Sequence, residues 1–444
     1  MQKYKFLILF TLSTTFSMGL WAQSLQETLN EVLQTHPQIK ERLQNYKAFQ
    51  KDITITQAEY YPKLDLSVSG GKERYTIHDI KDNYNIYENS LRYTQNLFNG
   101  LGTTYRLKEQ ELRKTAAAYS YIEKVNNISL TLASAYLDVL KNEELLGTAK
   151  ENVAIDKKIL IKVKKLYKFG LTTLSEVNKI ESSLALAESN LVVQEHTLLN
   201  AEYTLEKVVG KALNLSELAK PTDLVIELPK TKEEAFAFAL QHNPSLLISQ
   251  YNLNLAKAIK QENKSLFYPK VDVDISQSLN NNSSANERGY DRFRAMAYFS
   301  YNLFNGFSDK ATVEKNEIQI FQEVENLQNI KREIKKNLDF AWVSHEKLRK
   351  QRIYLVEYKD FSKKTLKLYA KEYDLGRRSL LDLLSSQNDF IRAKAELISN
   401  EYAILLAKFQ ILDVMSQLPK TIMNPEANQN IYKEVDLTAH KRGN

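Results

Sequence analysis

The residues that could do chemistry are scattered along this 444-residue chain. The six histidines show neither the helical spacing of a metal pair nor a partnered nucleophile, and no glycine-rich loop could cradle a phosphate. Cysteine is absent, which removes disulfides, thiolate metal ligands and thiol nucleophiles. We therefore expect no catalytic site, no metal site and no cofactor. The histidines are His36, His78, His196, His242, His345 and His440.

Charged and aromatic side chains gather instead around two glycines, Gly170 and Gly376. Shortly after each glycine comes a Ser/Thr-x-x-Asp/Glu sequence, at 173–176 and at 379–382. This spacing is typical of a helix N-cap followed by an acidic side chain in the first turn. The pattern predicts that a helix begins just after each glycine.

Long stretches with few helix breakers flank these two glycines. Residues 171–209, 307–375 and 377–418 contain neither glycine nor proline, and 101–169 contain only Gly102 and Gly147. Apolar residues recur there at steps of three and four, as they do in coiled coils. Because glycine accepts the left-handed backbone that ends a helix, we predict two long helical hairpins that turn at Gly170 and Gly376.

Alternating apolar and polar residues precede the long helices and predict β-strands. The predicted strands cover about 62–77, 87–98, 269–279 and 291–304. A soluble hairpin packed on a core would show the same alternation. Aromatic residues at the strand ends favour a membrane–water interface instead. These aromatic residues are Tyr60, Tyr61, Phe98, Phe267, Tyr268 and Phe304.

The chain is internally duplicated. The sequence Asn-Leu-Phe-Asn-Gly at 96–100 recurs at 302–306, an offset of 306 − 100 = 206 residues. Tyr-Pro-Lys at 61–63 recurs at 268–270, an offset of 268 − 61 = 207 residues. So long a period indicates duplication of a domain-sized unit. We assign 23–210 to the first repeat, 211–230 to a linker, 231–418 to the second repeat and 419–444 to a tail.

The N-terminus is typical of an exported protein. Lys3 and Lys5 precede an apolar stretch that ends near Leu20, so residues 1–22 fit a secretory signal peptide. No later stretch approaches the ~20 apolar residues of a spanning helix, so we expect any membrane crossing to use strands. A bilayer leaves no water for open strand edges. Two copies would give eight strands and a barrel filled by side chains, whereas three would give twelve and leave a channel.

These features together resemble the TolC family of outer-membrane export proteins: the doubled strand hairpin, the Asn-Leu-Phe-Asn-Gly strand exits, the Tyr-Pro-Lys strand entries and the glycine-centred helical turns. The resemblance covers nearly the whole mature chain. It implies a mainly α fold with a β-barrel, in which a homotrimer forms a 12-stranded barrel in the outer membrane of a Gram-negative bacterium. The β-barrel would continue into a periplasmic α-helical barrel. The linker and the tail would form an equatorial belt around the helical barrel.

The same resemblance assigns roles to residues of the helical tips. Tyr373 and Arg378 would form a periplasmic constriction, with Glu176 of the other hairpin as a partner. Asp382 would give one carboxylate per copy to an acidic ring, which would favour cations. Ser385 stands where many members carry a second ring aspartate, a departure from the pattern. The cap and ring roles of Asp382 can coexist.

An exit duct of this kind implies a periplasmic adaptor and a proton-driven or ATP-driven inner-membrane pump as partners, with outer-membrane lipid around the barrel. The net charge of +7 is spread over 61 basic and 54 acidic residues, so we expect no nucleic-acid binding. The alternative function is a periplasmic coiled-coil adaptor or scaffold, which leaves the alternating strands unexplained. Drugs, metals and secreted polypeptides all fit the sequence as cargo.

Overall fold

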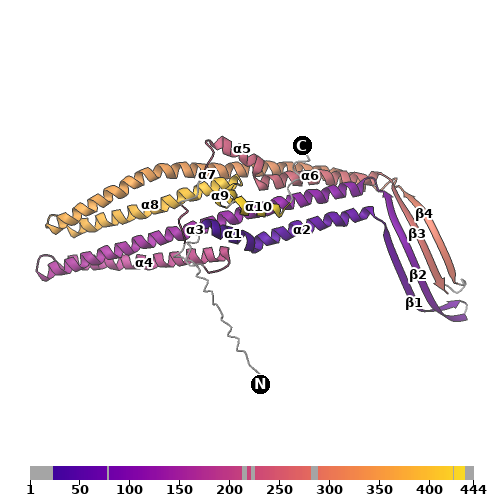
Figure 1. Ribbon diagram of the computed structural model, residues 1–444, viewed down its shortest axis with the longest axis horizontal. Coiled ribbons are helices and arrows are strands. Elements are labelled where there is room, and N and C mark those ends of the chain that lie inside the picture. Colours follow the sequence, from indigo (N-terminus) through magenta and orange to yellow (C-terminus); the bar gives the residue numbers. More distant parts are fainter. Residues whose placement is uncertain are drawn as a thin grey trace, which may run out of the picture.

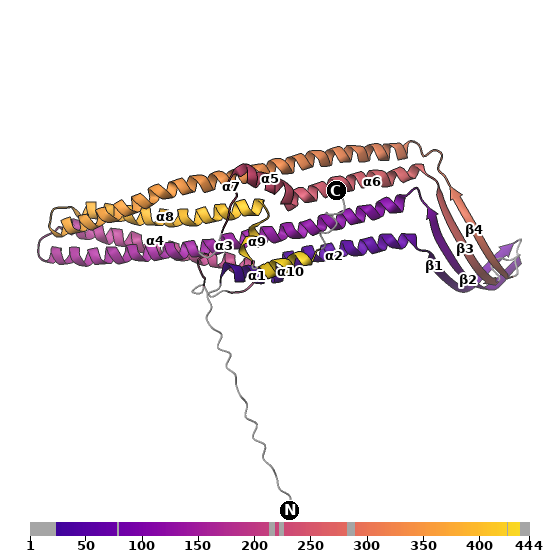
Figure 2. The same ribbon diagram turned by 45° about the horizontal axis from the view of Figure 1, so that its top comes forward.

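The computed structural model describes residues 24–77, 80–212, 218–221, 226–281, 289–423 and 425–435. A long bundle of helices carries a sheet at one end, bent away from the bundle axis (Figures 1 and 2). The predicted signal peptide, His78, His440 and parts of the predicted linker and tail lie outside the described residues.

Each repeat supplies two shorter helices, two strands and a long helical hairpin. The first repeat contains α1 (Leu25–Thr35), α2 (Pro37–Gln57), α3 (Gly102–Lys168) and α4 (Leu174–Val209). The second contains α5 (Lys232–His242), α6 (Pro244–Lys264), α7 (Ser308–Asp374) and α8 (Leu380–Val414), followed by α9 (Leu418–Ile422) and α10 (Pro425–Lys433). In the described part of the chain, no helix has the length and apolar character needed to cross a membrane.

Matching caps start the second helix of each repeat. His36 precedes Pro37, and its Nδ1 accepts the N–H of Gln38 at 3.3 Å. Asn243 precedes Pro244, and its Oδ1 accepts the N–H of Ser245 at 3.1 Å. Proline suits the first helical position because that position has no intrahelical acceptor for an N–H. Both residues therefore serve as structural caps in the same place of the repeat.

Four antiparallel strands form one sheet in the order β1-β2-β3-β4 (Figure 1). Their bounds are β1 (Lys63–Ile77), β2 (Ile80–Phe98), β3 (Lys270–Asn281) and β4 (Tyr290–Ser300). Within the described residues, β1 and β4 are edge strands with no partner on their outer side. Leu64, Leu66 and Val68 are 67%, 72% and 69% exposed, so no layer formed by the described residues covers their face of the sheet.

Strand β2 begins at Ile80, whereas the sequence predicts its start at residue 87. Residues 80–86 are mostly polar and lack a clear alternation, which made them resemble a loop. They pair in register with the far half of β1, and Arg74 Nε donates to Asn83 Oδ1 at 3.3 Å. Pairing with a neighbouring strand therefore extends β2 beyond what its own sequence indicates.

Strand β4 ends at Ser300, whereas the sequence predicts an end at 304. Asn302 Oδ1 accepts the N–H of Phe304 at 3.1 Å, a local bond that turns the backbone away from the extended form. In the first repeat the equivalent Asn96 donates instead to Asp272 of β3 at 2.7 Å. The Asn96 side chain therefore bonds to a neighbouring strand, whereas the Asn302 side chain, just beyond the end of edge strand β4, bonds to its own backbone.

The main core lies where the first repeat packs on the end of the second. Leu132 and Tyr136 of α3 are fully buried there together with Phe409 of α8 and Leu418 of α9. The Tyr136 hydroxyl donates to the Ala219 carbonyl oxygen at 2.7 Å, which ties part of the linker to this core. Helices α3 and α8 therefore hold the two hairpins side by side within one chain.

Candidate functional site

The two helical hairpins turn at the end of the bundle farthest from the sheet (Figure 1). Gly170 lies between α3 and α4 with φ +70°, and Gly376 lies between α7 and α8 with φ +68°. In each turn the glycine N–H and the next N–H donate back to carbonyl oxygens of the preceding helix, at 2.9–3.0 Å. An added Cβ would meet no other atom within 4 Å at either position, so space does not require glycine there. The positive φ does, because residues with a Cβ rarely adopt it.

Helices α4 and α8 begin with the same side-chain caps. Thr173 Oγ1 accepts the N–H of Glu176 at 3.4 Å, and Ser379 Oγ accepts the N–H of Asp382 at 3.1 Å. The carboxylates are held as well, because Thr172 donates to Glu176 and Ser379 Oγ donates to Asp382 Oδ2 at 2.8 Å. Glu176 and Asp382 thus occupy equivalent positions in the first turn, where the helix dipole favours negative charge. Ser385 is exposed one turn further along α8.

Tyr373 lies in a small apolar core that joins the two hairpins near the tip. The core contains Val163 of α3, Ile180 of α4 and Leu383 of α8, and Tyr373 is 8% exposed within it. Burial, together with the nearby Glu176 carboxylate, raises the pKa of Tyr373 to about 12. The Tyr373 hydroxyl has no hydrogen bond of good geometry among the described residues, so Glu176 acts on it through proximity.

Arg378 pairs with residues of its own hairpin within this chain. Its Nε donates to Glu372 Oε2 at 2.9 Å, and its guanidinium lies 4.1 Å from the ring centroid of Tyr369. The hydrogen bond to Glu372 raises the pKa of Arg378 further. Both partners lie in the last turns of α7, so within this chain Arg378 braces its own hairpin turn.

Two charged residues that the sequence did not single out connect the hairpins directly. Lys162 of α3 forms an ion pair with Asp374, the last residue of α7. The Lys162 ammonium also lies 5.7 Å from the ring centroid of Tyr373. No local pattern could have revealed this pair, because the two residues are 212 positions apart.

A groove of about 520 Å³ runs between α3 and α7 just above this ion pair. Its floor is apolar and includes Ile155, Leu366 and Phe390. Four lysines line it: Lys158, Lys162, Lys363 and Lys367. Glu151 and Asp374 line it as well, so the border of the groove carries more cations than anions.

A buried polar layer joins the hairpins further from the tip. Gln387 of α8, 1% exposed, donates to Asp156 Oδ1 at 2.7 Å and to Asn152 Oδ1 at 2.9 Å, both on α3. Ser183 of α4 also donates to Asp156. Burial raises the pKa of Asp156, while these two hydrogen bonds oppose the shift. The layer fixes the register of α3 against α8, since a slipped register would leave these groups unpaired.

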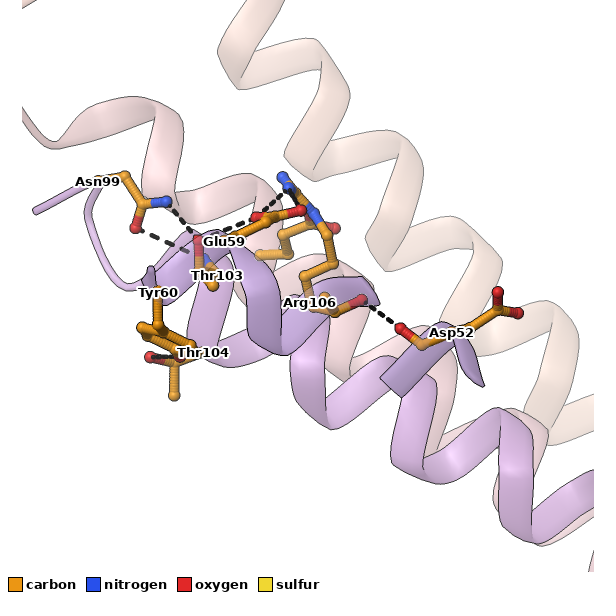
Figure 3. A network of polar contacts seen from close by, with 9 residues as sticks. Asp52, Glu59, Tyr60, Asn99, Thr103, Thr104 and Arg106 are labelled. Atoms are coloured by element: carbon orange, nitrogen blue, oxygen red, sulfur yellow. Dashed lines mark hydrogen bonds and ion pairs between the residues drawn. The ribbon is translucent and has the colours of Figure 1, made fainter. Parts of the chain in front are cut away.

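At the opposite end of the bundle, a polar network holds the helices where they meet the sheet (Figure 3). Arg106 of α3 binds Glu59 at 2.8 Å and Glu262 of α6 at 2.8 Å, and Glu59 lies in the short 3-10 helix η1 (Ala58–Tyr60) that follows α2. Glu109, one turn further along α3, is 4% exposed, and its Oε1 has no partner among the described residues. Burial, assisted by Glu262, raises the pKa of Glu109 to about 8, although Arg113 and Arg106 oppose the shift.

The six aromatic residues predicted to mark a membrane interface lie at this junction. Because the strands are antiparallel, the starts of β1 and β3 and the ends of β2 and β4 share one end of the sheet. All six side chains are exposed, from 38% for Phe98 to 70% for Tyr61 and Phe304. The Tyr60 hydroxyl also donates to Thr104 Oγ1 at 3.0 Å. The six residues are thus exposed at the same end of the sheet, and their role at a membrane–water interface stays a prediction.

Among the described residues, no three His, Asp or Glu side chains come together as metal ligands would. His345 lies beside Lys408 and Arg349 in a groove lined by α7 and α8. Burial lowers the pKa of His345, and these two cations lower it further. The charge around this histidine disfavours a bound cation. The tips of the hairpins remain the candidate functional site.

Comparison with known proteins agrees with this geometry. The sequence matches the outer membrane efflux protein family over residues 28–211 and 237–415. It is 20% identical to the outer membrane protein TolC of Vibrio cholerae, with 95% of this chain and 97% of that protein covered. It is also 20% identical to the outer membrane efflux protein BepC of Brucella suis, with 83% and 80% covered. The crystal structure of CusC is similar with a TM-score of 0.79 at 16% identity, covering 87% of this chain and 91% of that one.

This chain belongs to the outer membrane efflux protein family, because the match covers most of both repeats. The family consists of outer-membrane transport channels rather than enzymes. The protein is therefore an outer-membrane efflux or secretion channel with a large periplasmic helical part, and the family supports this function over a periplasmic adaptor.

Proposed function

We propose that three copies of this chain close into a 12-stranded barrel in the outer membrane, continued by a periplasmic α-helical duct. One observation carries the proposal: the sheet exposes apolar side chains on an uncovered face and has two free edges. A lone sheet of this kind is unstable in a bilayer, because its edge N–H and C=O groups find no partner there. Pairing β4 of one copy with β1 of the next satisfies both edges without any further protein.

The helical part offers a second line of support. Helices α3 and α7 have 67 residues each, yet α7 buries only seven of its residues in this chain and α3 buries many more. Exposed apolar residues such as Tyr354 and Phe361 occupy the uncovered side of α7. Large exposed apolar surfaces mark interfaces. A ring of three chains would cover this side.

The substrate would enter from a periplasmic adaptor and an inner-membrane pump, either proton-driven or of the ABC type. PrtF of Dickeya chrysanthemi is a proteases secretion protein, 21% identical over 380 residues, and BepC is an efflux protein. Both kinds of transport therefore fit this chain. The lysine-bordered groove between α3 and α7 is the surface we assign to the adaptor, since its charge suits an acidic helix.

The gate would lie at the tips. Tyr373, Arg378 and Glu176 would narrow the periplasmic mouth, and Asp382 from each copy would place negative charge at the entrance. An acidic ring in a narrow pore favours cations. The Lys162–Asp374 ion pair would hold the two hairpins together in the closed arrangement, and the Arg378–Glu372 bond would brace the turn of the second hairpin. Partner binding would open the mouth by replacing these contacts.

Purified protein in detergent tests the assembly directly. We expect native mass spectrometry to give three chains, a heat-modifiable band on gels, and discrete cation-selective conductance steps in planar bilayers. Membranes washed with salt should retain the protein. Release by salt as a soluble species without conductance would contradict the proposal and would instead favour a periplasmic adaptor.

A further inference from the structure

A pocket of about 320 Å³ lies where α3, α6 and α7 meet the end of α8. Its lining includes three carboxylates, those of Glu123, Glu333 and Asp413, together with amide and hydroxyl side chains. None of the described residues that line it is a lysine, an arginine or a histidine. The pocket therefore presents oxygen atoms and negative charge with no cationic side chain in its lining.

Two buried oxygen atoms of this pocket have no hydrogen-bond partner among the described residues. They are Oδ1 of Asn126, a residue that is 3% exposed, and Oδ1 of Asp413. Buried acceptors are almost always paired, because an unpaired one loses its bonds to water without a replacement. Burial also raises the pKa of Asp413 to about 7, which reflects the cost of its uncompensated charge. A cation in the pocket would satisfy both oxygen atoms.

The end of α8 carries the opposite charge from the one that suits a helix C-terminus. The helix dipole places partial negative charge there and favours cations, yet the last turn of α8 contains Asp413 and no basic residue. The equivalent position in the first repeat is 413 − 206 = 207, and Lys207 lies in the last turn of α4. A bound cation would give α8 the positive charge that Lys207 gives α4.

Ser416 also differs from its equivalent in the first repeat. The equivalent position is 416 − 206 = 210, and Gly210 and Ser416 both have a positive φ, 84° and 57°. Glycine adopts this backbone more readily than serine. The Ser416 hydroxyl, however, accepts a hydrogen bond from Asn126 Nδ2 and so orients the amide of a pocket residue. Backbone strain that holds a side chain in place is typical of functional sites.

Two further hydrogen bonds hold the walls of the pocket together. Asn243 Nδ2 donates to the Val414 carbonyl oxygen at 2.9 Å, and Ser245 Oγ donates to Glu123 Oε1. The start of α6 is thereby tied to α8 and to α3, so the walls are arranged before any ligand binds. Among the described residues no three acidic side chains converge as metal ligands would, so the exposed Glu333 stays outside the ligand set.

We propose that this pocket binds one calcium ion through the carboxylates of Asp413 and Glu123 and the amide oxygen of Asn126, with water completing the shell. Oxygen ligands suit this hard cation, whereas transition metals prefer the imidazole and thiolate groups that the lining lacks. Two carboxylates balance the charge of the ion. With so few protein ligands we expect a dissociation constant of about 10⁻⁴–10⁻³ M.

The site lies within one chain and outside the barrel and the gate, so the inference goes beyond the proposed function. A bound ion would connect α3 with the end of α8, the two helices that hold the hairpins side by side. It would therefore stabilise the folded chain in proportion to the calcium supplied.

Equilibrium dialysis of the purified full-length protein in detergent, after treatment with a chelator, tests the site. Calcium chloride should give about one ion per chain that depends on Asp413, so Asp413→Asn should lose it. Asp382→Asn is the control and should retain this ion, because Asp382 lies in the first turn of α8 and Asp413 in the last. Tighter binding of magnesium than of calcium would overturn the choice of ion. Unaltered protein that forms trimers and conducts but binds no calcium would overturn the site alone.

Ser416→Gly supplies a second test with a variant that should fold at least as well. Glycine suits the positive φ, so the melting temperature without calcium should rise. The affinity for calcium should fall several-fold, because the Asn126 amide loses its anchor. A purely structural role of Ser416 would not produce these opposite changes. An unchanged calcium affinity of Ser416→Gly would contradict Asn126 as a ligand.

Discussion

Lys162 of α3 and Asp374 of α7 form an ion pair that connects the tips of the two helical hairpins. Each side chain is partly exposed, so solvent weakens the attraction, and exposed pairs of this kind contribute about 0–1 kcal/mol. Such a contact can break without unfolding the protein. It is therefore suited to holding a closed state that must later open.

We expect Asp374→Asn to raise the closed-state conductance in planar bilayers, while the melting temperature changes little. The charge-swapped variant Lys162→Glu/Asp374→Lys should bring the conductance back toward its original value, because the attraction is restored with exchanged signs. A closed-state conductance that is the same in both variants as in the unaltered protein would contradict a role of this pair in closing the tip.

Arg378→Ser should also raise the closed-state conductance. The change removes the bond to Glu372 and the contact with the ring of Tyr369, so the turn after α7 loses its brace. Arg377→Ser is the matched control, because Arg377 is the exposed neighbouring residue with the same charge. Equal effects of the two variants would point to net charge alone rather than to the specific contacts of Arg378.

Asp382→Asn should lower the cation preference while the stability of the protein stays nearly unchanged. Asparagine keeps a side-chain oxygen beside Ser379, and the Ser379 cap on the backbone N–H of residue 382 remains. Ser379→Ala should do the reverse and cost about 1 kcal/mol of stability without moving the reversal potential. If Asp382→Asn leaves the reversal potential unchanged, Asp382 acts as a helix cap and not as part of an acidic ring.

Glu109→Gln should stabilise the protein at pH 8 and above, with a smaller effect near pH 5. Burial raises the folded-state pKa of Glu109 to about 8, above its ordinary value, so the folded protein binds this proton more tightly than the unfolded chain. Stability contributed by the protonated group is therefore lost as the pH rises from about 5 toward 8.

Glutamine is neutral at every pH and avoids this loss, which amounts to at least ~1.4 kcal/mol if one pKa unit of the shift is realised. Thermal unfolding of Glu109→Gln and of the unaltered protein, measured from pH 5 to pH 9, tests this difference in stability. Glu88→Gln, on an exposed part of β2, serves as the control. Parallel pH profiles for Glu109→Gln and the unaltered protein would contradict a buried, proton-binding Glu109.

Gly376→Ala should destabilise the second hairpin turn by about 1 kcal/mol, because alanine disfavours the left-handed backbone at φ +68°. Gly147→Ala supplies the opposite control. Gly147 lies inside α3 where an added Cβ meets nothing within 4 Å, so alanine should stabilise the helix by about 0.5–1 kcal/mol. Thermal unfolding of both variants tests the signs, and a stabilising Gly376→Ala would contradict the turn geometry.

Many structural features of this protein depend only on residues close together in the chain, so the sequence alone predicts them. Gly170 and Gly376 are required by backbone conformation, and Thr173 and Ser379 cap the next helices with side chains only three residues from their targets. The duplication and the strand alternation are likewise patterns in the chain itself. Local backbone sterics and short-range hydrogen bonds fix these features, so they need no knowledge of distant residues.

The partners of side chains were decided by the tertiary structure. Arg378 binds Glu372, Lys162 forms an ion pair with Asp374, and Gln387 reaches Asp156 across 231 residues. Strand ends follow the same rule, because Asn96 continues its strand beside Asp272 while Asn302 turns the chain at an open edge. Long-range pairing depends on how helices and strands are set beside one another, and no local spacing in the sequence encodes that placement.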